Sequence, residues 1–210
     1  VLISQYPSGE DVQNLLASKL FACEKDEILV GNGASELIKA ALEILPGKVG
    51  VIAPTFNEYG ERAGKDRVKT FIPSDKNFDY SISEIKDFSK DLSVLVLINP
   101  DNPSGHFFNK KEMKDLISYL NSINVKIIVD ESFIDFSGEE NEFSLIDSDI
   151  LEKYENLIVI KSISKSYGVP GIRLGVLASG EKDLIKSIRK HLSIWNINSF
   201  GEYFMQIIGK

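Results

Sequence analysis

The feature that most constrains the fold is the alternation of short apolar runs with amphipathic stretches along the chain. The runs are rich in Val and Ile and too short for buried helices, so we interpret them as β-strands. They cover Glu27–Val30, Val49–Ala53, Val68–Ile72, Val94–Ile98, Lys126–Val129, Leu157–Ile160 and Leu174–Ala178. Several are apolar at consecutive positions, which is typical of strands buried on both faces of a mostly parallel sheet.

The stretches between these runs carry apolar residues at helical spacing. The predicted helices are Asp11–Phe21, Ser35–Leu45, Asn109–Leu120 and Glu181–Leu192. The expected buried stripe of the first helix consists of Val12, Leu15, Leu16 and Leu20. Asn109 is a candidate N-cap of the third helix. Strands that alternate with helices predict a three-layer α/β/α fold with a mostly parallel central sheet.

Composition excludes several classes of protein. The chain has 24 Lys and Arg against 31 Asp and Glu, a net charge of −7, which argues against a nucleic-acid-binding protein. Cys23 is its only cysteine, so neither a disulfide framework nor a cysteine zinc site is expected. The apolar run Val94–Ile98 is too short to span a bilayer, and we see no signal peptide, so we expect no membrane association and a cytoplasmic location.

The ends of the chain suggest a larger protein. It begins with Val1, and the segment 195–210 stops on an apolar pattern. We therefore expect residues 1–210 to form one domain of a longer polypeptide. The acidic stretch Gly138–Asn141 is expected to be a surface turn.

The residues that follow the strands are the most informative, because ligands of such sheets bind outside the carboxyl ends of the strands. The first predicted strand is followed by Gly31-Asn32-Gly33-Ala34-Ser35, which opens a helix. A glycine-rich turn at a helix N-terminus leaves backbone N–H groups free to bind a phosphate. The alternative is a tight turn with a serine N-cap. The pattern matches neither the dinucleotide-binding fingerprint nor the P-loop.

Three further strand ends carry candidate groups. In Pro54–Tyr59, Phe56 or Tyr59 could cover a planar ring, although either one taken alone is better explained as a core or lid residue. The loop Asn99–Gly105 contains two Asn/Asp-Pro steps and is expected to be rigid, with a cis X-Pro bond conceivable, unless it is a plain turn. Asp130 ends an apolar strand, where a carboxylate needs a partner. That partner is a cationic ligand atom, a salt bridge or a helix cap.

The segment from Lys161 to Gly175 is the densest in polar groups. Lys165 lies between serines, from where its amine can reach a pocket. Arg173 begins the next strand and is suited to bind a phosphate with two hydrogen bonds. The alternative is a solvated basic turn.

Together these segments resemble the fold-type-I pyridoxal-phosphate (PLP) enzymes, in particular the class I/II aminotransferases. The similarity extends from Tyr6-Pro7 to Gly175, and its most specific part is Ser162-Ile163-Ser164-Lys165 followed by Arg173. The Asn99–Gly105 loop and Asp130-Glu131-Ser132-Phe133 support it. Within the superfamily the chain is most similar to histidinol-phosphate aminotransferase and threonine-phosphate decarboxylase.

The resemblance implies a role for each residue. Lys165 would form the Schiff base with pyridoxal 5′-phosphate, and Asp130 would pair with the pyridinium nitrogen. Asn102 would hydrogen-bond the phenolic oxygen, and Phe56 would stack on the ring. The groups implied to hold the cofactor phosphate are the backbone at Gly33, Ala34 and Ser35 and the side chains of Ser162, Ser164 and Arg173. Tyr6 would reach the cofactor phosphate of a partner subunit, which implies a homodimer with shared active sites.

Two departures from the family pattern affect the expected reaction. Phe133 stands where the aminotransferases usually have Tyr, whereas threonine-phosphate decarboxylases have Phe. The small C-terminal domain that binds the substrate carboxylate is also absent, so we expect residues 1–210 to be the PLP-binding large domain. Transamination between an amino acid and an oxo-acid or aldehyde is the first expectation, and decarboxylation is the alternative.

Two readings from other classes stay open. One is a PLP-fold module that binds a ligand without catalysis, and the other is a nucleotide-binding α/β domain. The second leaves Lys165, Asp130 and the Asn-Pro loop unexplained. His106 and His191 are too isolated to indicate a metal site.

Overall fold

A single sheet organises the computed structural model, which describes residues 4–138 and 143–208. Its strands are β1 Ile28–Asn32, β2 Val49–Ile52, β3 Val68–Phe71, β4 Val94–Ile98, β5 Lys126–Asp130, β6 Leu157–Lys161 and β7 Leu174–Ala178. All seven agree with the predicted runs to within two residues at either end. The predicted acidic turn lies mostly at residues outside the described ranges.

The strands follow the order β1-β7-β6-β5-β4-β2-β3. The pairs β2/β3, β2/β4, β4/β5 and β5/β6 are parallel, whereas β7 is antiparallel to both β1 and β6. The prediction of a mostly parallel sheet is therefore confirmed. In the register, Asp130 of β5 lies beside Ile98 of β4 and Ile160 of β6. The residues after β4, β5 and β6 thus emerge side by side at one edge of the sheet.

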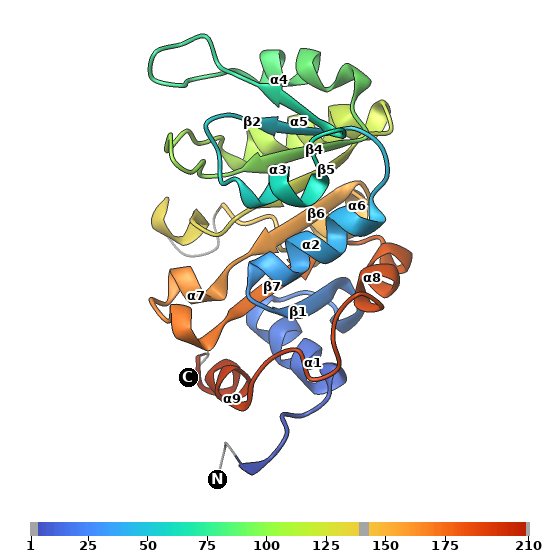
Figure 1. Ribbon diagram of the computed structural model, residues 1–210, viewed down its shortest axis with the longest axis vertical. Helices are drawn as coiled ribbons and strands as arrows, with labels where there is room; N and C mark the ends of the chain where they lie inside the picture. Colours follow the sequence, from blue (N-terminus) through green and yellow to red (C-terminus); the bar gives the residue numbers. More distant parts are fainter. Residues whose placement is uncertain (1–3, 139–142, 209–210) are drawn as a thin grey trace.

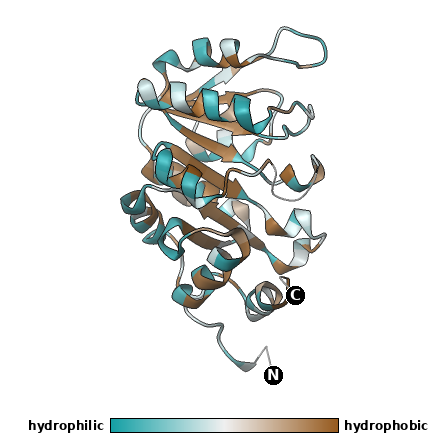
Figure 2. Ribbon diagram, turned by 180° about the vertical axis from the view of Figure 1, so that it is seen from behind, coloured by the Kyte–Doolittle hydropathy of each residue, from teal (hydrophilic) through white to brown (hydrophobic). Residues whose placement is uncertain are grey.

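Helices cover both faces of the sheet, which confirms the three-layer α/β/α architecture. One buried cluster packs α1, α4, α5, α6 and α9 on one face, and a second packs α2, α3 and α8 on the other. The helices are α1 Glu10–Phe21, α2 Ala34–Ile44, α3 Glu58–Ala63, α4 Ile82–Phe88, α5 Lys110–Ser122, α6 Ser148–Lys153, α7 Ile163–Ser166, α8 Lys182–Arg189 and α9 Ser199–Ile207. Figure 1 shows α2 lying across β6 and β7. In Figure 2 the strands are hydrophobic, whereas the outward sides of the helices are hydrophilic.

The N-termini of two helices, α5 and α2, can be compared with the prediction. Asn109 caps α5, as predicted: its side chain accepts hydrogen bonds from the N–H groups of Lys111 and Glu112, and the Glu112 carboxylate accepts one from the Asn109 N–H. The helix α2 begins one residue earlier than predicted, and its N-cap is Gly33 rather than Ser35.

The predicted buried stripe of α1 is confirmed only in part, because Leu16 is half-buried against the core and Leu20 is half-buried, whereas the other two residues are exposed. Val12 and Leu15 are each 44% exposed, and the buried side chains of this helix are Gln13, Asn14, Ala17 and Ser18. The reason is that α1 packs beside the edge strand β1. Asn14 Oδ1 accepts a hydrogen bond of 3.2 Å from the N–H of Val30, and Gln13 Nε2 donates one of 2.7 Å to the Ser8 carbonyl. Satisfying these polar groups outweighs the burial of two aliphatic side chains.

Several short helices were not predicted. They are α3, α4, α6, α7 and the C-terminal α9, and the first four have between four and seven residues. Segments this short do not repeat the helical period often enough to be recognised. Within the described ranges, no helix has the length and apolar character needed to cross a membrane.

Candidate active site

The carboxyl ends of β5 and β6 form the centre of the candidate site. The N–H of Asn99, just after β4, donates to the Asp130 carbonyl at 2.9 Å, and the N–H of Glu131 donates to the Ile160 carbonyl at 2.8 Å. These bonds extend the sheet ladder past its last paired residues. They hold the three loops that follow β4, β5 and β6 in fixed positions.

Asp130 is 3% exposed, and both of its carboxylate oxygens accept hydrogen bonds. The Tyr59 hydroxyl donates to Oδ2 at 2.8 Å, and the N–H of Ser132 donates to Oδ1 at 2.9 Å. In the part of the chain that the structure describes, Asp130 forms no ion pair and caps no helix, so neither alternative from the sequence holds. Burial and the neighbouring Asp130 raise the pKa of the Tyr59 phenol well above its usual value, so it stays protonated and acts as a donor.

Lys165 lies on α7, which starts two residues after β6, and its side chain is exposed. Its Nζ is 5.2 Å from the ring centroid of Phe56 and 4.6 Å from that of Phe133. No acid of residues 4–138 or 143–208 forms an ion pair with it. The Phe56 ring in turn packs edge-on against Tyr59, with centroids 6.4 Å apart. A continuous series of contacts therefore connects the Lys165 amine to the Asp130 carboxylate.

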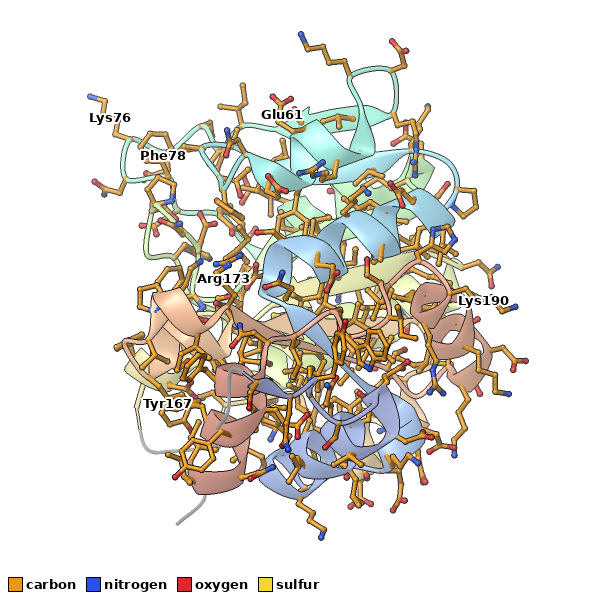
Figure 3. All side chains as sticks on the ribbon, turned by 60° about the horizontal axis from the view of Figure 1, so that its bottom comes forward. Glu61, Lys76, Phe78, Tyr167, Arg173 and Lys190 are labelled. Atoms are coloured by element: carbon orange, nitrogen blue, oxygen red, sulfur yellow. The ribbon has the colours of Figure 1, made fainter. Side chains whose placement is uncertain are left out.

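Glycines allow an arginine to approach the N-terminus of α2. A Cβ on Gly33 would fall 2.4 Å from Nη2 of Arg173, and one on Gly175 would fall 2.5 Å from the Ala34 nitrogen. Figure 3 shows Arg173 beside the start of α2. Arg173 itself has φ of +60°, a strained conformation for a residue with a side chain. A guanidinium next to helical N–H groups is suited to bind an anion, as predicted for the backbone of Ala34 and Ser35. The N–H of Gly33 differs from the prediction, because it donates to the Gly31 carbonyl at 2.8 Å.

The two predicted serines differ in their surroundings. The Ser164 hydroxyl accepts a hydrogen bond of 2.9 Å from the Leu174 N–H and also lies 3.3 Å from the Leu174 carbonyl. It therefore fastens α7 to β7 independently of any ligand. Ser162 donates its N–H to the Ser132 hydroxyl at 3.1 Å, whereas its own hydroxyl forms no hydrogen bond with another described residue. Ser162 therefore retains a hydroxyl that can serve a ligand.

Hydrogen bonds within the chain fix the start of the Asn99–Gly105 loop. The side chain of Asn99 accepts from the Phe108 N–H and donates to the Phe108 carbonyl, each at 2.9 Å. The peptide bonds Asn99-Pro100 and Asn102-Pro103 are cis. Asn102 is half-buried in this loop, which starts beside Asp130.

Tyr6 lies apart from the other candidates. Its ring is 76% exposed and stacks on Trp195, with centroids 4.3 Å apart. The remaining predicted residues surround the ends of β1, β2, β4, β5, β6 and β7.

Two residues of this site are not predicted from the sequence. Tyr59 is predicted as a ring cover or a core residue, without its hydroxyl bond to Asp130. Ser132, which contacts both Asp130 and Ser162, has no predicted role. No local signal indicates the Tyr59 contact, because its bond spans 71 residues and depends on the strand order. The Ser132 N–H lies two residues from the carboxylate that it binds, a local pattern typical of an aspartate turn.

The residues present fit pyridoxal 5′-phosphate. The cofactor's aldehyde needs an amine, its ring nitrogen needs an anion, and its phosphate needs cationic and N–H donors. Lys165 supplies the amine, the buried Asp130 supplies the anion, and the start of α2 with Arg173 supplies the donors. The close packing of Arg173 on Gly33 leaves no room for a side chain there.

Comparison with known proteins supports this interpretation. Residues 3–206 match the family described as aminotransferase class I and II. The chain is 34% identical to the L-serine phosphate decarboxylase of Sulfurospirillum multivorans, over 98% of this chain and 54% of that protein. It is 30% identical to the histidinol-phosphate aminotransferase of Pyrococcus furiosus, over 93% of this chain and 56% of that protein.

The fold agrees as well. A solved decarboxylase structure from Sulfurospirillum multivorans superposes with a TM-score of 0.83 at 30% identity, covering 96% of this chain and 58% of that one. The chain thus spans about half the length of the curated relatives it matches. It belongs to the class I and II aminotransferase family, which confirms both the resemblance seen in its strand-end motifs and pyridoxal 5′-phosphate as the cofactor.

Proposed function

We propose that residues 1–210 are the cofactor-binding large domain of a PLP-dependent enzyme that acts on a phosphorylated amino acid. The observation that carries the proposal is the connection of the Lys165 amine to the buried Asp130 carboxylate through Phe56 and Tyr59. A basic turn on a surface would have no reason to lie over two aromatic rings beside a buried anion.

Each of these residues would have a separate role in binding the cofactor or in the reaction. When bound, the cofactor withdraws electrons from the substrate's Cα. Lys165 would hold the cofactor's aldehyde through Nζ and, once the substrate's amine has taken that position, would move protons at the substrate's Cα. Asp130 holds a proton on the ring nitrogen by its negative charge. Arg173, Ser162 and the N–H groups at the start of α2 hold the phosphate.

Asn102 is proposed to hydrogen-bond the phenolic oxygen, and Phe56 to cover one face of the ring. The loop that carries Asn102 starts beside Asp130, and the Lys165 amine lies over the Phe56 ring. Tyr6, exposed on the N-terminal segment, is proposed to contact the phosphate of a partner subunit in a homodimer. Ser164 is also proposed to contact the phosphate, although its hydroxyl already accepts a hydrogen bond from the Leu174 N–H.

We infer that the reaction is decarboxylation of a phosphorylated amino acid such as L-serine phosphate. The similarity to the L-serine phosphate decarboxylase of Sulfurospirillum multivorans and the presence of Phe133 rather than Tyr favour it. In this reaction Lys165 would return one proton to Cα after CO₂ leaves. Transamination is the second candidate, favoured by the similarity to histidinol-phosphate aminotransferase. In that reaction Lys165 would move a proton from Cα to the cofactor's C4′.

The test starts with the full-length protein and its Lys165→Ala variant. The wild type is expected to be yellow with PLP and to give a borohydride-stable adduct that mass spectrometry maps to Lys165. Lys165→Ala should lose both the adduct and turnover. A stable adduct in this variant would contradict the proposal. The wild type is then incubated with L-serine phosphate, threonine phosphate and histidinol phosphate, each with and without a 2-oxo-acid as amino acceptor, and CO₂ and the oxo product of each amine are measured. CO₂ that forms without the acceptor supports decarboxylation, and an oxo product that forms only with the acceptor and without CO₂ supports transamination.

A further inference from the structure

The side chain of Tyr59 contacts both Asp130 and Phe56, the two groups that the proposed function places against the cofactor's ring. Its hydroxyl donates to Asp130 Oδ2 at 2.8 Å, and its ring packs edge-on against Phe56 at an interplanar angle of 83°. We propose that Tyr59 is a positioning residue, which holds the Asp130 carboxylate in the orientation that faces the cofactor's ring nitrogen. The proposal rests on the proposed function and assigns Tyr59 no contact with substrate or cofactor.

The position of Tyr59 in the fold is unusual for a core tyrosine. It lies on α3, which follows β2, whereas Asp130 ends β5, and β4 separates these two strands in the sheet. The side chain is fully buried among aliphatic residues of α2 and of the sheet face. A phenol in such surroundings needs a hydrogen-bond partner. The partner it has is the Asp130 carboxylate, 71 residues away.

The hydrogen bond from the Tyr59 hydroxyl gives the buried Asp130 carboxylate a side-chain donor. A buried carboxylate is costly to ionise unless donors point at it. The N–H of Ser132 is a local donor that any residue except proline could supply at that position. The Tyr59 hydroxyl is the side-chain donor, and its raised pKa keeps its proton in place. Of the titratable side chains described, Tyr59 contacts Asp130 directly. Lys165 is connected to Asp130 only through Phe56 and Tyr59.

The two parts of Tyr59 therefore have separable effects. The hydroxyl acts on Asp130, and the ring supports Phe56. Tyr59→Phe removes the first effect and keeps the second, because the ring stays in the core. Tyr59→Leu removes both.

The test uses the full-length protein loaded with PLP that carries ¹⁵N in its ring, and follows the ¹⁵N chemical shift across pH. In the wild type we expect a protonated ring nitrogen at neutral pH. In Tyr59→Phe the midpoint of this titration should fall by about one to two pH units, since one hydrogen bond to a charged group is lost. Cofactor affinity should change little. Tyr59→Leu should show the same lower midpoint and, in addition, weaker cofactor binding.

The matched control is Tyr154→Phe. Tyr154 is also buried, but its hydroxyl accepts a hydrogen bond from Ser118 at 3.3 Å on the other face of the sheet. This variant should keep the wild-type midpoint. An unchanged midpoint in Tyr59→Phe would overturn the proposal. Absence of a Lys165 adduct in the wild type would instead overturn the proposed function, so the two failures are distinguishable.

Discussion

The guanidinium of Arg173 lies directly against Gly33, where a Cβ would fall 2.4 Å from Nη2. This contact places the positive charge of a side chain at the start of α2, where the free N–H groups also attract an anion. Since Gly33 has φ of +77°, both its backbone conformation and its packing require glycine.

Gly33→Ala should therefore displace Arg173 and weaken PLP binding roughly tenfold, as expected when a hydrogen-bonded charge is lost. The measurement is a titration of the protein with PLP, followed by absorbance. Gly64→Ala is the matched control, because Gly64 has φ of +84° but no atom within 4 Å of an added Cβ. Both variants should lose about 1 kcal/mol of stability from backbone strain. Equal cofactor affinity in the two variants would show that the Arg173 contact is unimportant.

Asp130→Asn should retain the cofactor but lose most activity. Asparagine has one oxygen, so it can keep only one of the hydrogen bonds from Tyr59 and Ser132, and it cannot hold a proton on the ring nitrogen by charge. We expect a decrease in kcat on the order of 10²-fold or more. The exposed Asp87 provides the control, Asp87→Asn. Turnover close to that of the wild type in Asp130→Asn would contradict the role of this carboxylate.

Ser164→Ala should destabilise the fold more than Ser162→Ala. Removing the Ser164 hydroxyl leaves the buried Leu174 N–H without its acceptor, which costs about 1 to 3 kcal/mol. The Ser162 hydroxyl forms no hydrogen bond with another described residue, so its removal should affect cofactor binding rather than stability. Urea denaturation of the apo-proteins measures the first effect and PLP titration the second. The reverse order of stabilities would refute this division.

Glu131 predicts a pH dependence of stability. It is 1% exposed and accepts hydrogen bonds of 2.7 Å from the Ser144 hydroxyl and the Leu145 N–H. Burial raises its pKa from 4.5 to about 7. Because the folded state holds this proton more tightly than the unfolded state, stability is highest below pH ~4.5 and falls as the pH rises toward ~7, by about 3 kcal/mol.

Glu131→Gln should remove this loss, because glutamine does not titrate and can still accept from Leu145. The free energy of unfolding is measured in urea at pH 5 and pH 8 for both proteins. The difference in unfolding free energy between pH 5 and pH 8 should be smaller in the variant than in the wild type. Comparison of the two proteins cancels the contributions of all other titratable groups. Identical pH dependences would show that Glu131 does not titrate in this range.

The sequence by itself determined the strands, the mostly parallel sheet and the positions where functional groups leave it. Each strand is a local run of apolar residues, so its ends can be recognised without knowing its neighbours. Asp130 follows such a run directly, and Asn102 and Lys165 lie four and five residues after the ends of two others.

The tertiary structure decided which side chains meet. Tyr59 reaches Asp130 only because β4 alone lies between β2 and β5, an order that no local pattern reveals. The buried face of α1 is polar because Asn14 satisfies the edge strand β1, where hydrophobic periodicity predicts the opposite. Ser164 likewise binds Leu174, although the motif suggests a ligand. In each case a hydrogen bond between distant segments outweighs a local preference, since a buried polar group must have a partner.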